Sequence, residues 1–467
     1  MIRLGKPMTL GEQARLVMFL ATPAILAQLT TTIMQYIDAS MVGSMGAEAS
    51  ASIGLMETTM WLLGSICSAT AAGFYVQVSH QLGSNDPARA RSTLRQGIMS
   101  VLVVSALLGL VSLAVSPFLP TWLGGNSHIT PTASAYFAIV ATALPIFQFS
   151  IFGAGMLRSS GNMVVPSVMS VVMMSLDVVF NFFLIFPTRP MELFGTQIMM
   201  PGMGMGVMGA AIGTVSAELV AASITMYILC FRSKELSLRI DTGRFLPTWG
   251  VVKRALHISL PMGLQQTIMC SAYVMTTIII APLGTFAIAA NSFGIIIESL
   301  CYMPGYGIAD AATTLVGQSM GAGRHELMKR FAWLSVGLGV TVMAVMGVVM
   351  YVGAPTAMAM MTPAEEVRRL GVEVLRIEAF AEPMFAAAIV SYGVFVGAAK
   401  TLVPSIMNLV SIWGVRISLA AMLAPSMGLR GVWIAMCIEL CFRGLIFLVK
   451  LKFWNIQTSC KHYGKDQ

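Results

Sequence analysis

Two aspartates stand in long apolar stretches of the sequence, where an ionised carboxylate is costly. Asp38 follows Arg15 by 23 residues, and Asp177 follows Arg158 by 19 residues. If both stretches are helices that run outward, rises of about 35 Å and about 29 Å place the two carboxyl groups in the outer half of a membrane. Asn181 lies one helical turn beyond Asp177 and can donate to a carboxylate. We therefore expect this group to bind a proton or a cation, which is the chemistry of a proton-driven switch.

Other polar residues in apolar stretches are candidates for the lining of a substrate cavity, because buried acids and amides mark transport pathways. These candidates are Glu57, Gln28, Gln266 and Glu298. A different role is expected for Glu439 and Arg443. They are four residues apart, so one helical turn would bring them together as a neutralising pair.

The composition requires these residues to be held by membrane helices. Of 467 residues, 57% are hydrophobic and 10% are charged, and the mean hydropathy is +0.80. A soluble domain carries roughly 25% charged residues, so a cytosolic enzyme, a nucleic-acid-binding domain or a disordered chain is excluded. The net charge of +8 fits the Lys and Arg that membrane proteins collect on their cytoplasmic side. We expect an all-α polytopic membrane protein.

Hydropathy predicts twelve transmembrane helices. If the N-terminus is cytoplasmic, 21 of the 28 Lys and Arg residues fall on the inside and four fall outside, as the positive-inside rule requires. Both termini are then cytoplasmic, and the inner (cytoplasmic) membrane of the cell is the expected location. The predicted spans are residues 16–43, 49–82, 97–119, 132–156, 163–187, 205–231, 255–281, 286–320, 331–354, 371–396, 401–424 and 431–449.

The two halves of the chain repeat each other. At an offset of 238 residues, Gly, Pro and Gln positions coincide, and beyond them the offset falls to 222, which leaves 16 extra residues in the outer loop Thr188–Met205. Six spans in each half predict two lobes related by a pseudo-twofold axis along the membrane normal. We expect an N-lobe at 1–231, a basic cytoplasmic linker at 232–254 and a C-lobe with a cytoplasmic tail at 255–467. Repeated pairs include Pro23/Pro261, Gln28/Gln266, Gly46/Gly284, Gly83/Gly321, Pro145/Pro383 and Pro166/Pro404.

Prolines within the spans are expected to bend their helices, because the ring removes a backbone hydrogen bond. We expect hinges at Pro23 and Pro261. Kinks are expected as well at Pro145, Pro166, Pro304, Pro383 and Pro404. The seven cysteines form no CxxC pair, so neither a disulfide framework nor a zinc site is indicated. No Walker motif is present, and we expect no cofactor.

Several segments resemble the multidrug and toxic compound extrusion (MATE) transporters. PAILAQLTTTIMQYIDASMVGSMG at 23–46 is similar to the first helix of that family, and ISLPMGLQQ at 258–266 is similar to its counterpart in the second half. ESLCYMPGYGIADAATTLVGQSMGAG at 298–323 resembles the eighth-helix signature, and GAAIGT at 209–214 resembles the sixth helix. The resemblance covers essentially the whole chain.

The resemblance implies a V-shaped pair of six-helix lobes that export substrates by alternating access, coupled to inward H⁺ or Na⁺. In the DinF-like branch the first-helix aspartate couples transport, and Asp38 matches it. Thr214 matches a sixth-helix threonine near the same site, and Asp177 and Asn181 stand in the reverse of the usual fifth-helix order. The NorM-like branch uses two acids in the second lobe, where this chain has Met269 and Phe385. Coupling through the first lobe is therefore favoured, with protons preferred over Na⁺.

Three classes of function remain to be compared. The leading hypothesis is a monomeric antiporter that exports amphipathic, cationic organic compounds or drugs and interacts with the lipid bilayer but not with nucleic acid. A lipid-linked oligosaccharide flippase of related architecture is the alternative, which Arg376 and Arg416 keep open. An intramembrane aspartyl protease using Asp38 and Asp177 is disfavoured, because no GxGD motif occurs. We therefore expect a transporter and not an enzyme.

Overall fold

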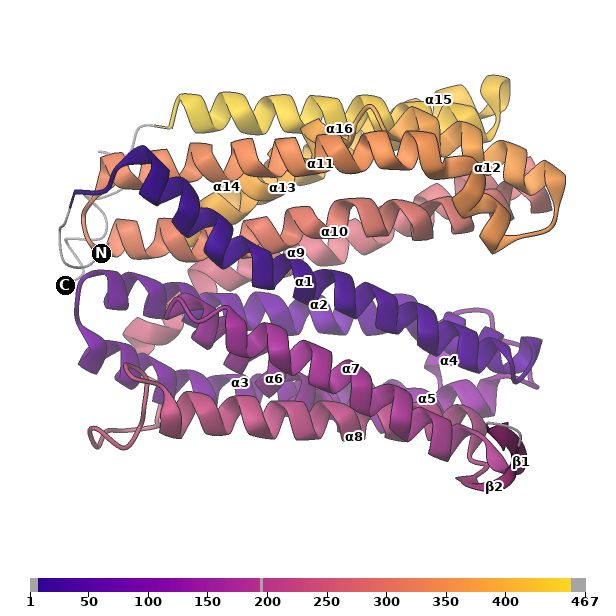
Figure 1. Cartoon of the computed structure of the whole chain (residues 1–467), viewed down its shortest axis with the longest axis horizontal. Coiled ribbons are helices and arrows are strands. Elements are labelled where there is room, and N and C mark those ends of the chain that lie inside the picture. The colour runs from indigo at the N-terminus through magenta and orange to yellow at the C-terminus, as the bar shows by residue number, and fades with distance from the viewer. Residues whose placement is uncertain (1–6, 194–195, 455–467) are drawn as a thin grey trace. The chain divides into compact units, whose positions relative to one another are not determined.

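The computed structural model describes residues 7–193 and 196–454, and most of these are helical (Figure 1). Short π-helical or 3₁₀ turns extend or join the helices at η1 (Ile228–Arg232), η2 (Ala281–Leu283) and η3 (Ser411–Ile417). The first half of the chain contains α1 (Leu10–Gly43), α2 (Ala47–Gly83), α3 (Pro87–Val115), α4 (Leu119–Trp122), α5 (Thr130–Thr142), α6 (Leu144–Ser159), α7 (Val164–Ile185) and α8 (Gly206–Tyr227). The second half contains α9 (Trp249–Ile280), α10 (Thr285–Gly321), α11 (His325–Met361), α12 (Glu365–Glu378), α13 (Glu382–Gly397), α14 (Leu402–Val410), α15 (Ser418–Met427) and α16 (Leu429–Lys452).

The described part of the chain contains up to twelve segments that are long and apolar enough to cross a membrane. Ten are single helical runs, and two are bent pairs of helices that each count as one span. Every predicted apolar stretch corresponds to one of the twelve. The prediction of an all-α polytopic membrane protein is therefore confirmed.

Both bent pairs break at repeated prolines. The bend between α5 and α6 is 48°, and the bend between α12 and α13 is 59°. Pro145 and Pro383 occupy the first turn of α6 and α13. Proline is tolerated at this position because its missing N–H has no intrahelical partner there. The predicted kinks at these two prolines are confirmed. Pro23, Pro261 and Pro304 instead lie inside α1, α9 and α10, which each continue as one helix.

The predicted outer loop Thr188–Met205 is a β-hairpin. β1 (Pro187–Leu193) pairs antiparallel with β2 (Thr196–Met203), with a bulge between Pro187 and Arg189. The all-α prediction included no strand here, because a short hairpin outside the spans has no membrane-spanning hydropathy pattern. A two-stranded hairpin outside the spans can satisfy its backbone groups by pairing and by contact with water. The guanidinium of Arg189 lies 4.0 Å from the ring centre of Phe186, and this cation–π contact joins the hairpin to the end of α7.

The structure divides into two compact units, and three helices contribute residues to both. Unit 1 comprises Met1–Gln28, Ser79–Asn85 and Leu264–Gln467, and unit 2 comprises Leu29–Val78 and Asp86–Gly263. The division therefore falls within α1, α2 and α9. The predicted lobes at 1–231 and 255–467 stay a prediction.

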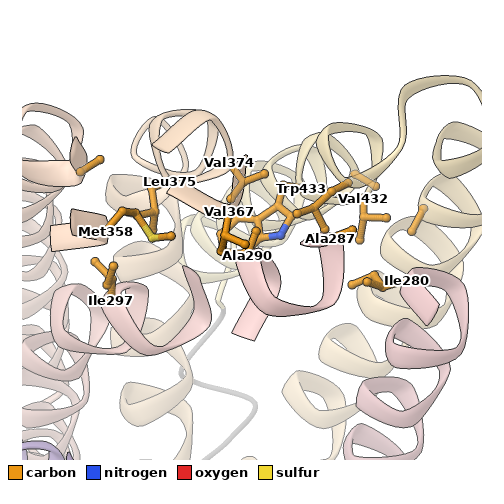
Figure 2. Close-up of a cluster of buried hydrophobic side chains, with 14 of the residues drawn as sticks. Ile280, Ala287, Ala290, Ile297, Met358, Val367, Val374, Leu375, Val432 and Trp433 are labelled. Atoms are coloured by element: carbon orange, nitrogen blue, oxygen red, sulfur yellow. The ribbon is translucent and has the colours of Figure 1, made fainter. Parts of the chain in front are cut away.

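One hydrophobic cluster of unit 1 contains Trp433 of α16, which is 1% exposed (Figure 2). Figure 2 shows its indole among aliphatic side chains that include Val374, Val367 and Ala290. The indole Nε1 donates to Asn291 Oδ1 at 3.0 Å, so the ring is buried without leaving its N–H unsatisfied. A Cβ on Gly294 would lie 2.9 Å from the indole. This glycine therefore lets α10 approach the tryptophan.

The linker between the two halves is fastened to α3 in unit 2. Its irregular part spans 233–248, because η1 extends to Arg232 and α9 begins at Trp249. Arg91 Nε contacts Asp241 Oδ2 at 2.7 Å, and Arg95 Nη2 contacts Asp241 Oδ1 at 2.5 Å. Gln96 Oε1 accepts hydrogen bonds of 2.9 Å from both the backbone N–H and the hydroxyl of Thr248. Two buried arginines and one glutamine thus hold the linker in place.

We expect Asp241→Asn to release the linker from α3, because the amide cannot form the two ion pairs. The Arg95 hydrogen bond, with Arg91 nearby, holds the pKa of Asp241 below its ordinary value of 3.8. The ion pairs are therefore present at neutral pH and are lost as the pH falls through that lowered pKa. Hydrogen exchange of the backbone amides of 233–248 should rise in the variant at pH 7, and in the wild type only under strong acid. Arg244→Gln, which changes an exposed linker charge, should leave exchange unchanged.

Candidate functional site

A polar centre in unit 2 joins α1 to α7. The Asn181 Nδ2 amide donates to Asp38 Oδ1 at 3.1 Å and to Asp177 Oδ2 at 3.1 Å. Asp177 is 0% exposed and Asn181 is 1% exposed. A side-chain amide carries two N–H donors, so this amide group uses both on carboxylates. The structure therefore brings together the three residues that the sequence singled out.

Two acceptor atoms of the centre have no hydrogen-bond donor within the described structure. Asp177 Oδ1 and Asn181 Oδ1 are buried and accept no hydrogen bond within the described structure. Thr214 of α8 and the Asp38 carboxyl make further polar contacts with Asp177. A buried acceptor without a donor is costly, and a proton or a small cation would satisfy it. Among the described residues no group of three or more His, Cys, Asp or Glu side chains is arranged to hold a metal ion.

Close packing of α7 on α8 sets the position of Asn181 (Figure 1). A Cβ on Gly213 would lie 2.0 Å from Asn181 Oδ1, and a Cβ on Gly209 would lie 2.5 Å from the backbone oxygen of Leu184. Two glycines one helical turn apart therefore let the helices approach, as small residues do at membrane helix interfaces. They begin and nearly end the GAAIGT segment, and sequence reasoning assigned them no place in the site.

We expect Gly213→Ala to damage both packing and function, because the new methyl group must displace Asn181 from the two carboxylates. Overpacking of this kind costs about 1–3 kcal/mol. The measurements are thermal unfolding in detergent and transport in proteoliposomes. Gly64→Ala is the matched control, because it is a helical glycine of unit 2 whose added Cβ meets nothing within 4 Å. If both variants transport normally, Gly213 does not position Asn181.

The predicted substrate-cavity residues are divided between the two units. Glu57 is exposed on α2 in unit 2. Gln28, Gln266 and Glu298 belong to unit 1, on α1, α9 and α10. One residue that interacts with the centre was missed by sequence reasoning. Tyr136 of α5 interacts electrostatically with Asp38, Glu57 and Asp177.

The predicted pair of Glu439 and Arg443 is confirmed and extends to a third charge. Arg443 Nε donates to Glu439 Oε1 at 2.7 Å, and Arg416 Nε donates to Glu439 Oε2 at 3.1 Å. Ser411 Oγ donates to the same carboxylate at 2.5 Å. Glu439 is 0% exposed, so this network in unit 1 holds a fully buried carboxylate between two cations.

One buried acid of unit 2 was not among the residues predicted for the site. Glu218 of α8 is 6% exposed and interacts electrostatically with Asp177. It follows Thr214 by four residues. This spacing places the two side chains on one face of the helix, and it is the signal that could have identified Glu218.

The comparisons with known proteins agree with this arrangement. The MatE family model matches the chain twice, at residues 23–183 and at residues 261–422. The two matches begin at the repeated prolines Pro23 and Pro261, as expected for a duplicated six-helix unit. Together they cover more than half of the chain.

Similar proteins span nearly the full length. A protein named "Probable multidrug resistance protein NorM" from Chromobacterium violaceum is 26% identical over 97% of this chain and 96% of its own length. A NorM protein from Thermotoga maritima is 23% identical over 92% and 90%. A solved structure described as the outward-facing conformation of a multidrug resistance MATE family transporter shares the fold, with a TM-score of 0.86, 18% identity and coverage of 96% and 97%.

The DinF-like branch stays a prediction, because the relatives named here carry NorM names. The family itself is established by a twofold match to its model, by full-length relatives and by a shared membrane fold. This multi-pass membrane protein therefore belongs to the MatE family of multidrug and toxic compound extrusion transporters.

Proposed function

We propose that this protein is a secondary active antiporter that exports amphipathic, cationic organic compounds in exchange for protons. The observation that carries the proposal is the Asn181 amide, which bridges two carboxylates in a buried centre and leaves Asp177 Oδ1 without a donor. A centre of this kind changes its hydrogen bonding when it takes up a proton. The names of the relatives, which describe multidrug resistance proteins, support drug-like substrates.

Each residue of the centre has a proposed role. Asp38 and Asp177 share the coupling proton, Asn181 holds their carboxylates together, and Thr214 adds a hydroxyl to the same centre. Protons are preferred to Na⁺ because Met269 and Phe385 occupy the second-lobe positions where the NorM-like branch has acids. Asp38, Asp177, Asn181 and Thr214 also offer carboxylate, amide and hydroxyl oxygens that could bind Na⁺. Na⁺ is therefore the other coupling ion to test.

The substrate cavity, the hinges, the oligomeric state and the location are proposed from the sequence. Glu57, Gln28, Gln266 and Glu298 are proposed to line the substrate cavity, and Pro23 and Pro261 are proposed hinges. The protein is proposed to work as a monomer, in two lobes, in the bacterial inner membrane. The excess of Lys and Arg in the even-numbered connections between the spans, such as Arg89–Arg95 between the second and third spans, supports cytoplasmic termini.

The test is transport of ethidium, a fluorescent organic cation, by the purified protein in proteoliposomes. A pH gradient and a Na⁺ gradient are imposed separately. Transport that follows the pH gradient supports the proposal, and transport that follows only the Na⁺ gradient changes the coupling ion. Transport under neither gradient contradicts the antiporter and directs the search to lipid-linked substrates.

A further inference from the structure

A cavity of about 90 Å³ lies in unit 2 between α1, α6, α7 and α8. Five polar side chains line it, and the other lining residues are apolar or small. A volume of this size holds several water molecules, since about 10–15 Å³ suffices for one. The polar lining residues are Thr31, Ser150, Ser170, Glu218 and Thr225.

Glu218 is the only ionisable residue among those that line the cavity. Its side chain is 6% exposed and is hydrogen-bonded to Ser150 of α6. No Lys, Arg or His belongs to the lining, so no cation of the cavity wall neutralises Glu218. The acid that acts on Glu218 is Asp177 of the neighbouring helix α7, and Asp177 in turn interacts with Asp38 of α1.

One helical turn connects this cavity to the polar centre. Glu218 follows Thr214 on α8 by four residues, a rise of about 6 Å, and Thr214 contacts Asp177. In the other direction the cavity reaches Thr225, seven residues further along α8, toward η1 and the linker. The polar side chains thus form a line from the carboxylate centre toward the end of the unit that carries the linker.

We propose that Glu218 and the cavity that it lines form a proton relay between the Asp38–Asp177–Asn181 centre and the linker side of unit 2. This inference rests on the proposed proton coupling. The O–H bond of the protonated aspartate breaks, and water in the cavity carries the proton to the Glu218 carboxylate, where a new O–H bond forms. Glu218 then returns the proton to water beside Thr225 and is left ionised, as it began. The relay consumes no other reactant.

The test uses the full chain in proteoliposomes, with ethidium as substrate and a pH gradient as driving force. Glu218→Gln should slow transport by about tenfold or more, because the amide cannot accept the proton. The Kd for ethidium should change by less than about twofold, because the cavity is not the substrate site. Glu48→Gln, which alters an exposed acid of α2 in the same unit, is the matched control and should transport as the wild type does.

Two further measurements separate a relay from a structural role. In Glu218→Ala, added formate or azide should restore part of the transport, since a small weak acid can carry the proton through the enlarged cavity. The infrared difference spectrum between acid and neutral pH should lose a carboxyl C=O band in Glu218→Gln. If that variant does not fold, Ser150→Ala and Thr225→Val test the same path, and each should slow transport.

Two outcomes would overturn the relay alone. One is wild-type transport by Glu218→Gln under the pH gradient. The other is Na⁺ binding that disappears in that variant while proton-driven transport persists, which would make the cavity a cation site. Absence of pH-driven transport by the wild type would overturn the proposed function, and the relay with it.

Discussion

We expect Asp38→Asn to abolish proton-coupled export while the protein still folds. The substituted amide has nearly the same shape, and its oxygen can still accept the 3.1 Å hydrogen bond from Asn181. It cannot take up or release a proton. Loss of a proton-transfer group lowers a rate by about 100-fold or more. The measurement is pH-driven ethidium transport in proteoliposomes.

Stability distinguishes this loss from misfolding. Thermal unfolding of Asp38→Asn should stay within about 1 kcal/mol of the wild type, since the change is isosteric. Asp177→Asn should also lose coupling, and its amide would supply a donor beside the unsatisfied Asn181 Oδ1. Coupled export that persists in Asp38→Asn would remove this residue from the mechanism and leave Asp177 as the candidate.

The carboxylate centre could be predicted because sequence spacing determines depth in a membrane helix. Asp38 and Asp177 lie at similar distances from cytoplasmic arginines, and Asn181 lies one turn beyond Asp177. The contribution of α8 was harder to predict. Whether Gly213 faces Asn181 depends on the rotation of α8 about its axis, and α8 is too uniformly apolar for its pattern to fix that rotation.

The membrane spans could also be predicted, because hydropathy gives the length and the apolar composition of each helix directly from the sequence. Whether a proline would bend its helix could not be predicted from the sequence. Pro145 and Pro383 coincide with bends of 48° and 59°, whereas α1 continues through Pro23. Near Pro23, Gly307 of α10 packs so closely that an added Cβ would lie 2.6 Å from the backbone nitrogen of Ile25. Tight packing of this kind supports a helix through its proline, and it depends on a partner far away in the sequence.

We expect Glu439→Gln to destabilise unit 1 strongly, because it removes the one carboxylate to which both Arg443 and Arg416 donate in a buried site. The side chains of Arg443 and Arg416 are only 9% and 14% exposed. Breaking a buried ion pair by removing one partner costs about 3–5 kcal/mol. The variant also weakens the acceptor of Ser411. The measurement is the free energy of unfolding in detergent, obtained from a thermal or denaturant titration.

The exposed pair of Arg430 and Glu373 provides the matched control within the same unit. Arg430 donates to both oxygens of Glu373, yet its side chain is 52% exposed. An ion pair in contact with water contributes about 0–1 kcal/mol, so Glu373→Gln should change stability little. Both variants turn a glutamate that is paired with arginine into its amide. A difference between their changes in stability therefore reports the effect of burial and not the effect of losing an ion pair. Equal effects of the two variants would mean that water or lipid headgroups reach Arg416 and Arg443, and that Glu439 is not held in an apolar interior.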